Sequence, residues 1–140
     1  MELRHAEQIA VLLNSRNELT KRYDAEAVMK ESHNYVYRIE NDSVTACVEV
    51  KPVQWYQAEI CHLTVHPDFE RRGYAKQLLA AALDRAKSQL ARIAQCTIRE
   101  GNIASENLFS SFGFAHVASF RNEKSSNNVY VWQKVIIPAL

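Results

Sequence analysis

The protein is a chain of 140 residues with 17 Lys and Arg, 16 Asp and Glu, and a formal net charge of +1. This length fits a single domain with one hydrophobic core, predicted over residues 1–140, and 47% hydrophobic residues are typical of globular proteins. The near-neutral charge gives no support to nucleic-acid binding, and no apolar run reaches the roughly 20 residues that span a bilayer. We therefore expect no nucleic-acid or membrane partner.

The first third of the chain has helical periodicity, with an apolar face over residues 6–13 and a second short helix after Asp24. Asp24 is a favourable N-cap residue for that second helix. Strand-like runs follow at residues 35–40, 44–50 and 58–65. Asn41-Asp42 predicts the turn between the first two strands, and Pro67 ends the third because it lacks the N–H that a strand ladder needs.

The second half alternates helices and strands. Apolar residues recur at helical spacing from Tyr74 to Leu90, and residues 93–98 form a short apolar strand. A helix is predicted from about residue 103 to Phe112, where Gly113 is placed to end it. Two final strands are predicted, at residues 114–120 and 129–137.

This order of elements predicts an α/β fold with a mixed sheet covered by helices. The strand–helix–strand unit from Ala58 to Ile98 requires a right-handed crossover and a locally parallel pair. The hairpins on either side require antiparallel edges. No strand is predicted before the first helix, so the strand at residues 35–40 lies at an edge that a second copy can pair with in a homodimer.

The three cysteines, Cys47, Cys61 and Cys96, each lie in an apolar, strand-like run. Their odd number and their settings predict reduced, buried thiols in a cytoplasmic protein. Residues 1–5 lack the apolar core of a signal peptide. Cys61 and His62 are expected on opposite faces of a strand and no second ligand cluster exists, so no metal site is predicted.

A turn rich in basic residues joins the strand at residues 58–65 to the next helix. It contains Glu70, Arg71, Arg72 and Gly73 and leads directly into Tyr74, Ala75 and Lys76. The first N–H groups of a helix have no intrahelical partner and lie at the positive end of its dipole. The amides from Arg71 to Lys76 are therefore a candidate phosphate or pyrophosphate site, and the three basic side chains add positive charge.

Two motifs together resemble the GNAT superfamily of N-acetyltransferases over about residues 35–135. The turn is similar to the family's Gln/Arg-x-x-Gly-x-Gly/Ala loop. Asn102-x-x-Ser105 followed by Leu108-Phe109-x-x-Phe112-Gly113-Phe114 resembles its Asn-x-x-Ala…Leu-Tyr-x-x-x-Gly-Phe segment. The resemblance implies a mostly antiparallel central sheet with a splayed parallel pair and helices on both faces.

The resemblance also implies acetyl-CoA as cosubstrate and a set of contacts for it. The pyrophosphate is expected on the amides of Arg71, Arg72, Gly73, Tyr74, Ala75 and Lys76. Leu63, Thr64 and Val65 are expected to offer their backbone to the pantetheine arm. Asn102 and Phe109 are expected on the other wall, and Asn102 also fits a helix N-cap.

The chain departs from the family pattern at two positions. Glu70 stands where Gln or Arg is usual, so its carboxylate is expected to face solvent or to pair with an arginine. Phe109 stands where many members have the tyrosine that protonates the departing CoA thiolate. Tyr130, Ser110 or a water are the alternative donors, and their order is open.

Glu59 is the candidate general base that takes a proton from the acceptor amine. It is on the strand before the loop, where some members carry a catalytic glutamate, and regular alternation puts it on one face with Cys61, Leu63 and Val65. This apolar setting is expected to raise its pKa. A salt-bridged structural glutamate is the alternative, and His62 is the second candidate base.

The sequence thus predicts transfer of an acetyl group from acetyl-CoA to a primary amine of a small molecule or protein. The acceptor is expected between the segments at residues 17–23 and 55–56 and the last strands. A CoA-binding sensor or interaction module with weak or no catalysis is the alternative, which Phe109 favours. A nucleic-acid-binding domain is disfavoured because the basic residues are dispersed and do not interleave with aromatic ones.

Overall fold

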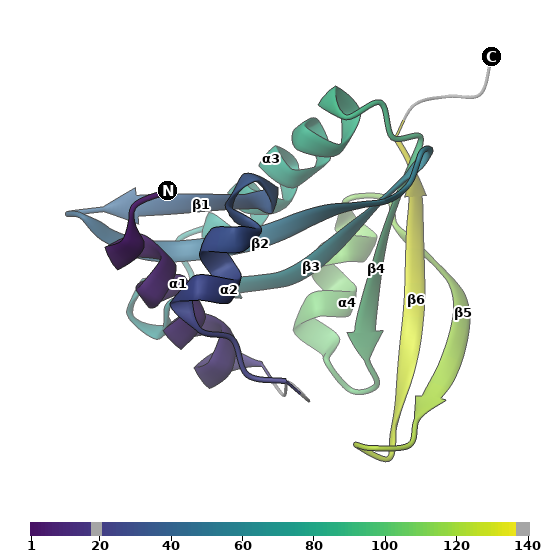
Figure 1. The fold of residues 1–140 in the computed structure, drawn as a ribbon. Coiled ribbons are helices and arrows are strands. Elements are labelled where there is room, and N and C mark those ends of the chain that lie inside the picture. The colour runs from purple at the N-terminus through teal and green to yellow at the C-terminus, as the bar shows by residue number, and fades with distance from the viewer. Residues whose placement is uncertain (18–20, 137–140) are drawn as a thin grey trace. The chain divides into compact units, whose positions relative to one another are not determined.

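The computed structural model describes residues 1–17 and 21–136, and Figure 1 labels the helices and strands. The elements in chain order are α1 (Leu3–Arg16), α2 (Ala25–Lys30), η1 (Ser32–Asn34), β1 (Tyr35–Glu40), β2 (Ser43–Gln54), β3 (Gln57–Val65), η2 (Pro67–Phe69), α3 (Tyr74–Ser88), β4 (Ile93–Arg99), α4 (Ile103–Ser111), β5 (Ala115–Asn122) and β6 (Asn127–Val135). Two compact units are present. One comprises Met1–Val50 and His62–Ala82, and the other comprises Lys51–Cys61 and the residues from Leu83 onward.

The strands form one mixed sheet in the order β1-β2-β3-β4-β6-β5. The register pairs β1 with β2, β4 with β6 and β5 with β6 in antiparallel fashion, and β3 with β4 in parallel fashion. The parallel ladder has three residue pairs, from Gln57 with Ile93 to Glu59 with Gln95, although both strands continue further. The predicted mixed, mostly antiparallel sheet with one parallel pair is therefore confirmed.

In the first unit, α1 and α2 pack side by side and cover β1 and β2 (Figure 1). The predicted apolar face of α1 is buried, from Ala6 to Leu13, and packs with Val28, Tyr35 and Cys47. The Asp24 side chain accepts a hydrogen bond from the Ala27 N–H at 2.8 Å, which confirms the predicted cap. Every residue from Val44 to Val50 is buried, so both faces of this part of β2 are covered.

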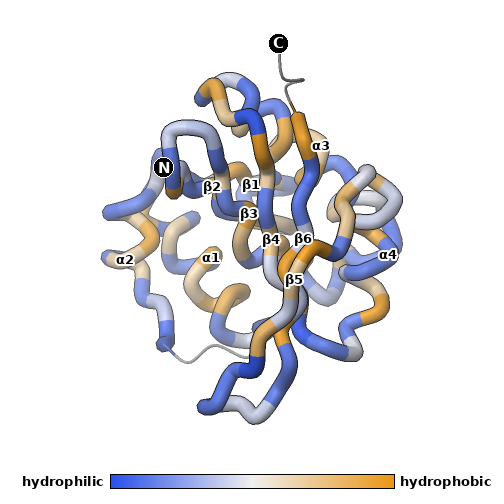
Figure 2. Tube along the Cα trace, turned by 90° about the vertical axis from the view of Figure 1, so that its right-hand side faces the viewer, coloured by the Kyte–Doolittle hydropathy of each residue, from blue (hydrophilic) through white to orange (hydrophobic). Residues whose placement is uncertain are grey.

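In the second unit, β4 lies between β3 and β6, and β5 lies at the end of the strand order. The turn between β5 and β6 is hydrophilic (Figure 2), as its run of Asn, Glu, Lys and Ser requires. Both strands begin and end near the predicted positions, and residue 137 lies outside the described part of the chain. Strand β2 is longer than predicted because it continues through Pro52 to Gln54, where the residues are exposed.

The end of α3 corrects one prediction. Leu90 was expected on the buried face of this helix, but α3 ends at Ser88 and Leu90 is 75% exposed. Leu90 adopts a φ of 64°, and its N–H donates to the Lys87 carbonyl at 2.9 Å. The helix stops at a left-handed residue without a glycine there, which helical periodicity does not predict.

The end of α4 is a Schellman motif formed around Gly113. The glycine has a φ of 88°, and the Phe114 N–H donates to the Phe109 carbonyl at 3.1 Å. The rings of these two phenylalanines pack edge to face, with centroids 5.0 Å apart. This is the hydrophobic contact that accompanies such helix ends, and it confirms Gly113 as the terminator.

Burial controls the chemistry of two of the three thiols, Cys47 and Cys96, whereas Cys61, which was also predicted to be buried, is only half-buried. Burial, with a smaller contribution from Glu49, raises the pKa of Cys47 to about 12. Burial also raises the pKa of Cys96 far above its ordinary value, with smaller contributions from Glu59 and Cys61. Cys47 and Cys96 therefore stay protonated near neutral pH, as expected of buried structural thiols.

We predict that Gly113→Ala lowers the free energy of unfolding by about 1 kcal/mol, because an L-residue is strained at positive φ. A Cβ at this position meets the Lys134 ammonium at 2.8 Å, and this flexible side chain can move away, so the backbone sets the cost. Urea unfolding of Gly113→Ala and of Asn107→Ala, an exposed change on α4, measures it. Equal midpoints for the two variants would contradict the prediction.

Candidate active site

The loop between β3 and α3 has the geometry that an anion site requires. Arg71 and Gly73 have φ values of 63° and 81°, and both residues are exposed. The first hydrogen bond of α3 in this loop runs from the Gln77 N–H to the Gly73 carbonyl, at 3.1 Å. The amides that precede Gln77 are thus the unpaired first turn of the helix. A Cβ on Gly73 meets nothing within 4 Å, so the open space beside it suits a bound group.

The loop and the start of α3 carry exposed cationic side chains and one buried aromatic ring, that of Tyr74. Arg72 and Lys76 are exposed, as is Arg71. Tyr74 is only 8% exposed: its ring lies 3.9 Å from the Arg38 guanidinium, and its hydroxyl donates to Glu40 at 3.1 Å. Tyr74 can therefore contribute its backbone N–H to the loop, while its side chain anchors the start of α3 to β1.

Glu70 pairs with an arginine, as predicted. Its Oε1 accepts a hydrogen bond from the Arg16 guanidinium at the end of α1. Both side chains are partly exposed, so the pair contributes little to stability. Its effect is electrostatic, because Arg16 offsets the negative charge of Glu70 next to the basic side chains of Arg71 and Arg72.

A hydrogen bond from Asn17, the residue after α1, holds the end of β3 in the first unit. Thr64, which is 5% exposed, donates through Oγ1 to the His62 carbonyl at 2.9 Å and accepts from the Asn17 side chain at 3.1 Å. Leu63 and Val65 are half-buried. His62 has a φ of 55°, which interrupts the regular alternation that was expected to place Glu59 and Val65 on one face.

His62 lies against the segment that precedes α2. Its Nε2 is 3.2 Å from the Tyr23 hydroxyl, and the two rings meet edge to face. Two hydrogen bonds with Asn14, at 2.7 and 2.8 Å, hold the Tyr23 backbone. The second candidate base is thus part of a network that ties this segment to β3. Residues 18–20 of the predicted acceptor segment lie outside the described part of the chain.

Glu59 is half-buried in the second unit, and its environment changes its proton affinity. Burial raises the pKa of this carboxyl above its ordinary value, against the opposing effects of the Gln95 hydrogen bond and the Lys51 charge. The predicted direction is therefore confirmed. Gln95 Nε2 donates to Glu59 Oε2 at 3.1 Å, and Gln133 Nε2 donates to Gln95 Oε1 at 2.6 Å.

These two glutamines were not found from the sequence. Gln95 is 36 residues from Glu59 along the chain, and Gln133 is 38 residues from Gln95. The sheet register alone makes them neighbours. The signal available in the sequence was a polar residue within each of two otherwise apolar strands. Without the register, that signal does not identify which polar residues are neighbours.

Asn102 and Phe109 have structural roles in the second unit. The Asn102 side chain caps α4 by accepting from the Ser105 N–H at 3.3 Å, as predicted. Phe109 is 5% exposed and packs on Phe114. It has no group that can donate a proton. Of the alternative donors, Ser110 is exposed on α4, and the Tyr130 ring lies 4.7 Å from His116.

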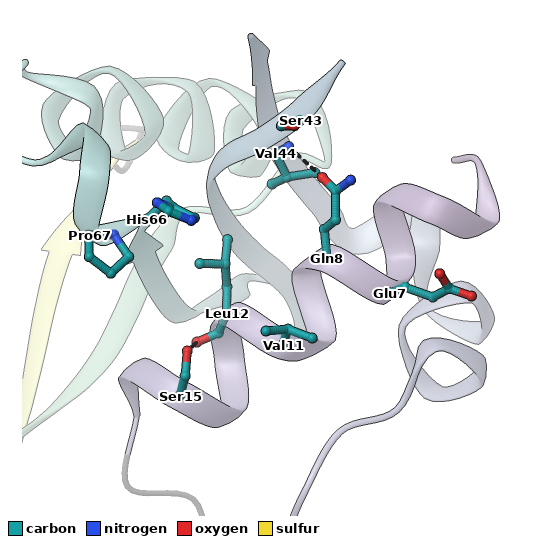
Figure 3. Close-up of a pocket in the computed structure, with 9 residues that line it drawn as sticks. All are labelled: Glu7, Gln8, Val11, Leu12, Ser15, Ser43, Val44, His66 and Pro67. Atoms are coloured by element: carbon teal, nitrogen blue, oxygen red, sulfur yellow. Dashed lines mark hydrogen bonds between the residues drawn. The ribbon is translucent and has the colours of Figure 1, made fainter. Parts of the chain in front are cut away.

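A groove of about 500 Å³ lies beside α1 in the first unit (Figure 3). The lining residues are Glu7, Gln8, Val11, Leu12, Ser15, Ser43, Val44, His66 and Pro67. Gln8 crosses it by accepting from the Val44 N–H at 2.7 Å. None of the predicted site residues lines this groove.

Each unit therefore holds its own part of the predicted set. The first unit contains the anion-binding loop and Leu63–Val65, and the second contains Glu59, Asn102 and Phe109. Among the described residues, no cluster of three or more His, Cys, Asp or Glu is arranged to hold a metal ion. Within that same part of the chain, no helix has the length and apolarity needed to cross a membrane.

Comparison with known proteins supports the interpretation of the fold. Ard1 from Thermoplasma volcanium has a TM-score of 0.84 and 17% identity, covering 99% of this chain and 95% of that one. The structure of yncA from Salmonella typhimurium with its cofactor acetyl-CoA also has a TM-score of 0.84 and 17% identity, covering 100% and 93%. At these identities the similarity shows a shared fold and no more.

A family model for the acetyltransferase (GNAT) family matches residues 3–114. The chain therefore belongs to this family, and the predicted family, enzyme class and cosubstrate agree with that membership. Over 66 residues it is 29% identical to a ribosomal protein bS18-alanine N-acetyltransferase from Haemophilus ducreyi. That match covers 47% of this chain and 46% of the relative, just under half of each.

We predict that Arg16→Ala weakens acetyl-CoA binding about twofold to fivefold, because the Glu70 carboxylate is then uncompensated beside the loop. Glu70→Gln in the Arg16→Ala background should restore the wild-type Kd. Calorimetry at low salt measures both changes. A loss that persists in the double variant would show that Arg16 acts on binding by another route.

Proposed function

We propose that the protein is an N-acetyltransferase that moves the acetyl group of acetyl-CoA directly to a primary amine, with residues 1–140 acting as one catalytic domain. The observation that carries this proposal is the exposed turn at Arg71 and Gly73, which presents the first amides of α3 in a chain of the GNAT family. A single domain is supported by β2, β3 and α3, because each contributes residues to both compact units.

The loop binds the diphosphate of the cosubstrate through the amides from Arg71 to Lys76. These N–H groups lie at the positive end of α3, and the exposed basic side chains add charge–charge attraction. Leu63, Thr64 and Val65 contribute backbone groups to the pantetheine arm. Asn102 and Phe109 form the opposite wall in this proposal.

Glu59 takes the proton that the acceptor must lose. An alkylammonium has a pKa near that of lysine, about 10.4, so few molecules are nucleophilic at neutral pH. Burial raises the pKa of Glu59, and a carboxylate with a raised pKa is a stronger base than an ordinary glutamate. Acetyl-CoA supplies the thioester, and the neutral amine attacks its carbonyl carbon.

Departure of the CoA thiolate depends less on proton transfer than attack by the amine does. A thiol pKa of about 8.5 makes the thiolate a good leaving group without full protonation. The absence of a hydroxyl on Phe109 is therefore tolerable, and Tyr130, Ser110 or a water remain the candidate donors.

We infer that the acceptor is an amino group of a protein or a small molecule. The 66-residue match to an enzyme named for an N-terminal alanine supports a protein α-amino group. In the second unit, Trp55 is 76% exposed, meets Tyr56 edge to face and lies 5.8 Å from the Arg92 guanidinium. This exposed aromatic pair belongs to a segment predicted to contact the acceptor.

A CoA-binding module without efficient catalysis is the second candidate. The observation in its favour is Phe109, whose buried ring serves the helix end and has no proton to donate. Measuring acetyl-CoA hydrolysis and transfer against a panel of amines and peptide N-termini separates the two. Tight binding without transfer to any of these acceptors would favour the module.

Location and assembly are also part of the proposal. The buried free thiols of Cys47 and Cys96 support a cytoplasmic location. Strand β1 stands at one end of the strand order, which supports the pairing of two copies through this edge.

We predict that Glu59→Gln lowers acetyl transfer by roughly 10²- to 10⁴-fold while acetyl-CoA binding is nearly unchanged. The wild-type rate should rise with pH as Glu59 loses its proton, and this rise should occur above the range of an ordinary glutamate because its pKa is raised. Turnover of both proteins from about pH 6 to 9 tests this, with Glu100→Gln as control. Unchanged turnover of Glu59→Gln would remove Glu59 as the base.

We predict that Gly73→Val abolishes measurable acetyl-CoA binding. A β-branched residue is strained at a φ of 81°, and its side chain enters the open space beside the loop. Ala80→Val adds the same side chain on an exposed part of α3 and should keep the wild-type Kd. Wild-type affinity of a folded Gly73→Val protein in calorimetry would contradict the loop assignment.

A further inference from the structure

Three polar side chains form one row across β3, β4 and β6 of the second unit. The register places Glu59 opposite Gln95 and Gln95 opposite Gln133. Directly opposite residues in neighbouring strands put their side chains on the same face of a sheet. The row is therefore fixed by backbone pairing and does not depend on flexible loops.

The hydrogen bonds along this row have one direction. Gln133 donates to the Gln95 carbonyl oxygen at 2.6 Å, and the Gln95 amide donates to Glu59 Oε2 at 3.1 Å. A flipped Gln95 would place its oxygen against the carboxylate and its NH₂ against the NH₂ of Gln133. Both contacts would be repulsive. The ionised carboxylate only accepts, so it requires Gln95 to donate, and the hydrogen bond from Gln133 to the Gln95 oxygen reinforces this orientation.

We propose that Gln95 and Gln133 are positioning residues for Glu59. They hold Oε2 of the carboxylate in the plane of the row, and the proton of the acceptor amine is taken on Oε1. They also stabilise the ionised form of the base. This inference rests on the proposed role of Glu59 as the general base, and it adds two residues outside the predicted site to the determinants of the reaction.

One other titratable group, Lys51, shifts the pKa of Glu59 in the same direction as the Gln95 hydrogen bond. Lys51 on β2 lowers the pKa of Glu59 by its charge, and it is unchanged in the variants below. Cys96 on β4 has a strongly raised pKa and stays neutral near pH 7. Cys61, two residues along β3, contributes to the raised pKa of Cys96.

Removal of the Gln95 donor has a definite sign. A hydrogen bond to the charged form of an acid lowers its pKa, so its loss raises the pKa of Glu59 above the wild-type value. A larger fraction of the base is then protonated at low pH. The acidic limb of the kcat/KM profile therefore moves to higher pH, and activity recovers as pH rises.

The test compares Gln95→Leu, Gln133→Leu and Thr97→Val. In Gln95→Leu we expect kcat/KM at about pH 6 to fall roughly threefold to tenfold more than at about pH 9, since loss of a typical hydrogen bond accounts for about that factor. Gln133→Leu keeps Gln95 but removes the hydrogen bond to its carbonyl oxygen. It should move the acidic limb of the kcat/KM profile in the same direction by a smaller amount. Thr97→Val lies on the same strand outside the row and should leave the profile unchanged.

A second readout makes the result independent of catalysis. Carboxyl ¹³C NMR, with the Glu59 signal assigned from its absence in Glu59→Gln, measures the titration of this group directly. A higher Glu59 pKa in Gln95→Leu or Gln133→Leu supports the inference, and either variant suffices where the other does not fold. A wild-type pKa in both folded variants overturns it.

The two readouts also separate this inference from the proposed function. A shifted NMR titration with an unshifted kcat/KM profile would support the hydrogen-bonded row and remove Glu59 from the reaction. An unshifted titration with loss of activity in Glu59→Gln would overturn the role of the glutamines and leave Glu59 as the base.

Discussion

The short parallel ladder between β3 and β4 is the constraint on which the second unit depends. Its last pair joins Glu59 to Gln95. Strand β4 continues beyond that pair, because its ladder with β6 extends to Arg99 with Val129. Gln95 is thus held on both sides by backbone pairing at the position where the parallel ladder ends. A candidate base at such a position has a rigid neighbour and a carboxylate that is only half-buried.

The properties of Glu59 follow from this location. Full burial would leave a glutamate neutral, and full exposure would leave it a weak base. Half-burial raises its pKa, and the Gln95 hydrogen bond and the Lys51 charge limit the rise. The raised pKa makes this carboxyl a stronger base than an ordinary glutamate, which is the property that the proposed role requires.

Local features of the site could be predicted from the sequence, and distant pairings could not. Gly73, the Asn102 cap and the Gly113 helix end each depend on neighbours within a few residues, so their spacing was informative. The partner of Glu70 is Arg16, 54 residues away, and the sequence predicted only that some arginine pairs with it. Gln95 and Gln133 were missed for the same reason, since register across a sheet is set by the whole fold.

The fold, like the site, could be predicted from the sequence where it depends on local signals and not elsewhere. The parallel pair of β3 and β4 follows from the strand–helix–strand order. The placement of β6 between β4 and β5 does not follow from the order of elements. Leu90 shows the limit: its spacing fits the buried face of α3, but the helix ends two residues earlier through hydrogen bonds to its own last turn. A helix end without glycine has no local sequence signal, and His62 likewise adopts a positive φ that strand alternation does not reveal.

Phe109 connects the fold to the chemistry. It supplies the carbonyl that accepts from Phe114 and the ring that packs on it, so the apolar side chain stabilises the end of α4. The chemical consequence is limited, because a thiolate whose parent thiol has a pKa of about 8.5 leaves readily, whereas an ammonium with a pKa near 10.4 cannot attack. The larger demand for proton transfer therefore falls on the amine. In the proposed mechanism that demand falls on Glu59, so we expect the row of Glu59, Gln95 and Gln133 to affect the rate more than the missing hydroxyl does.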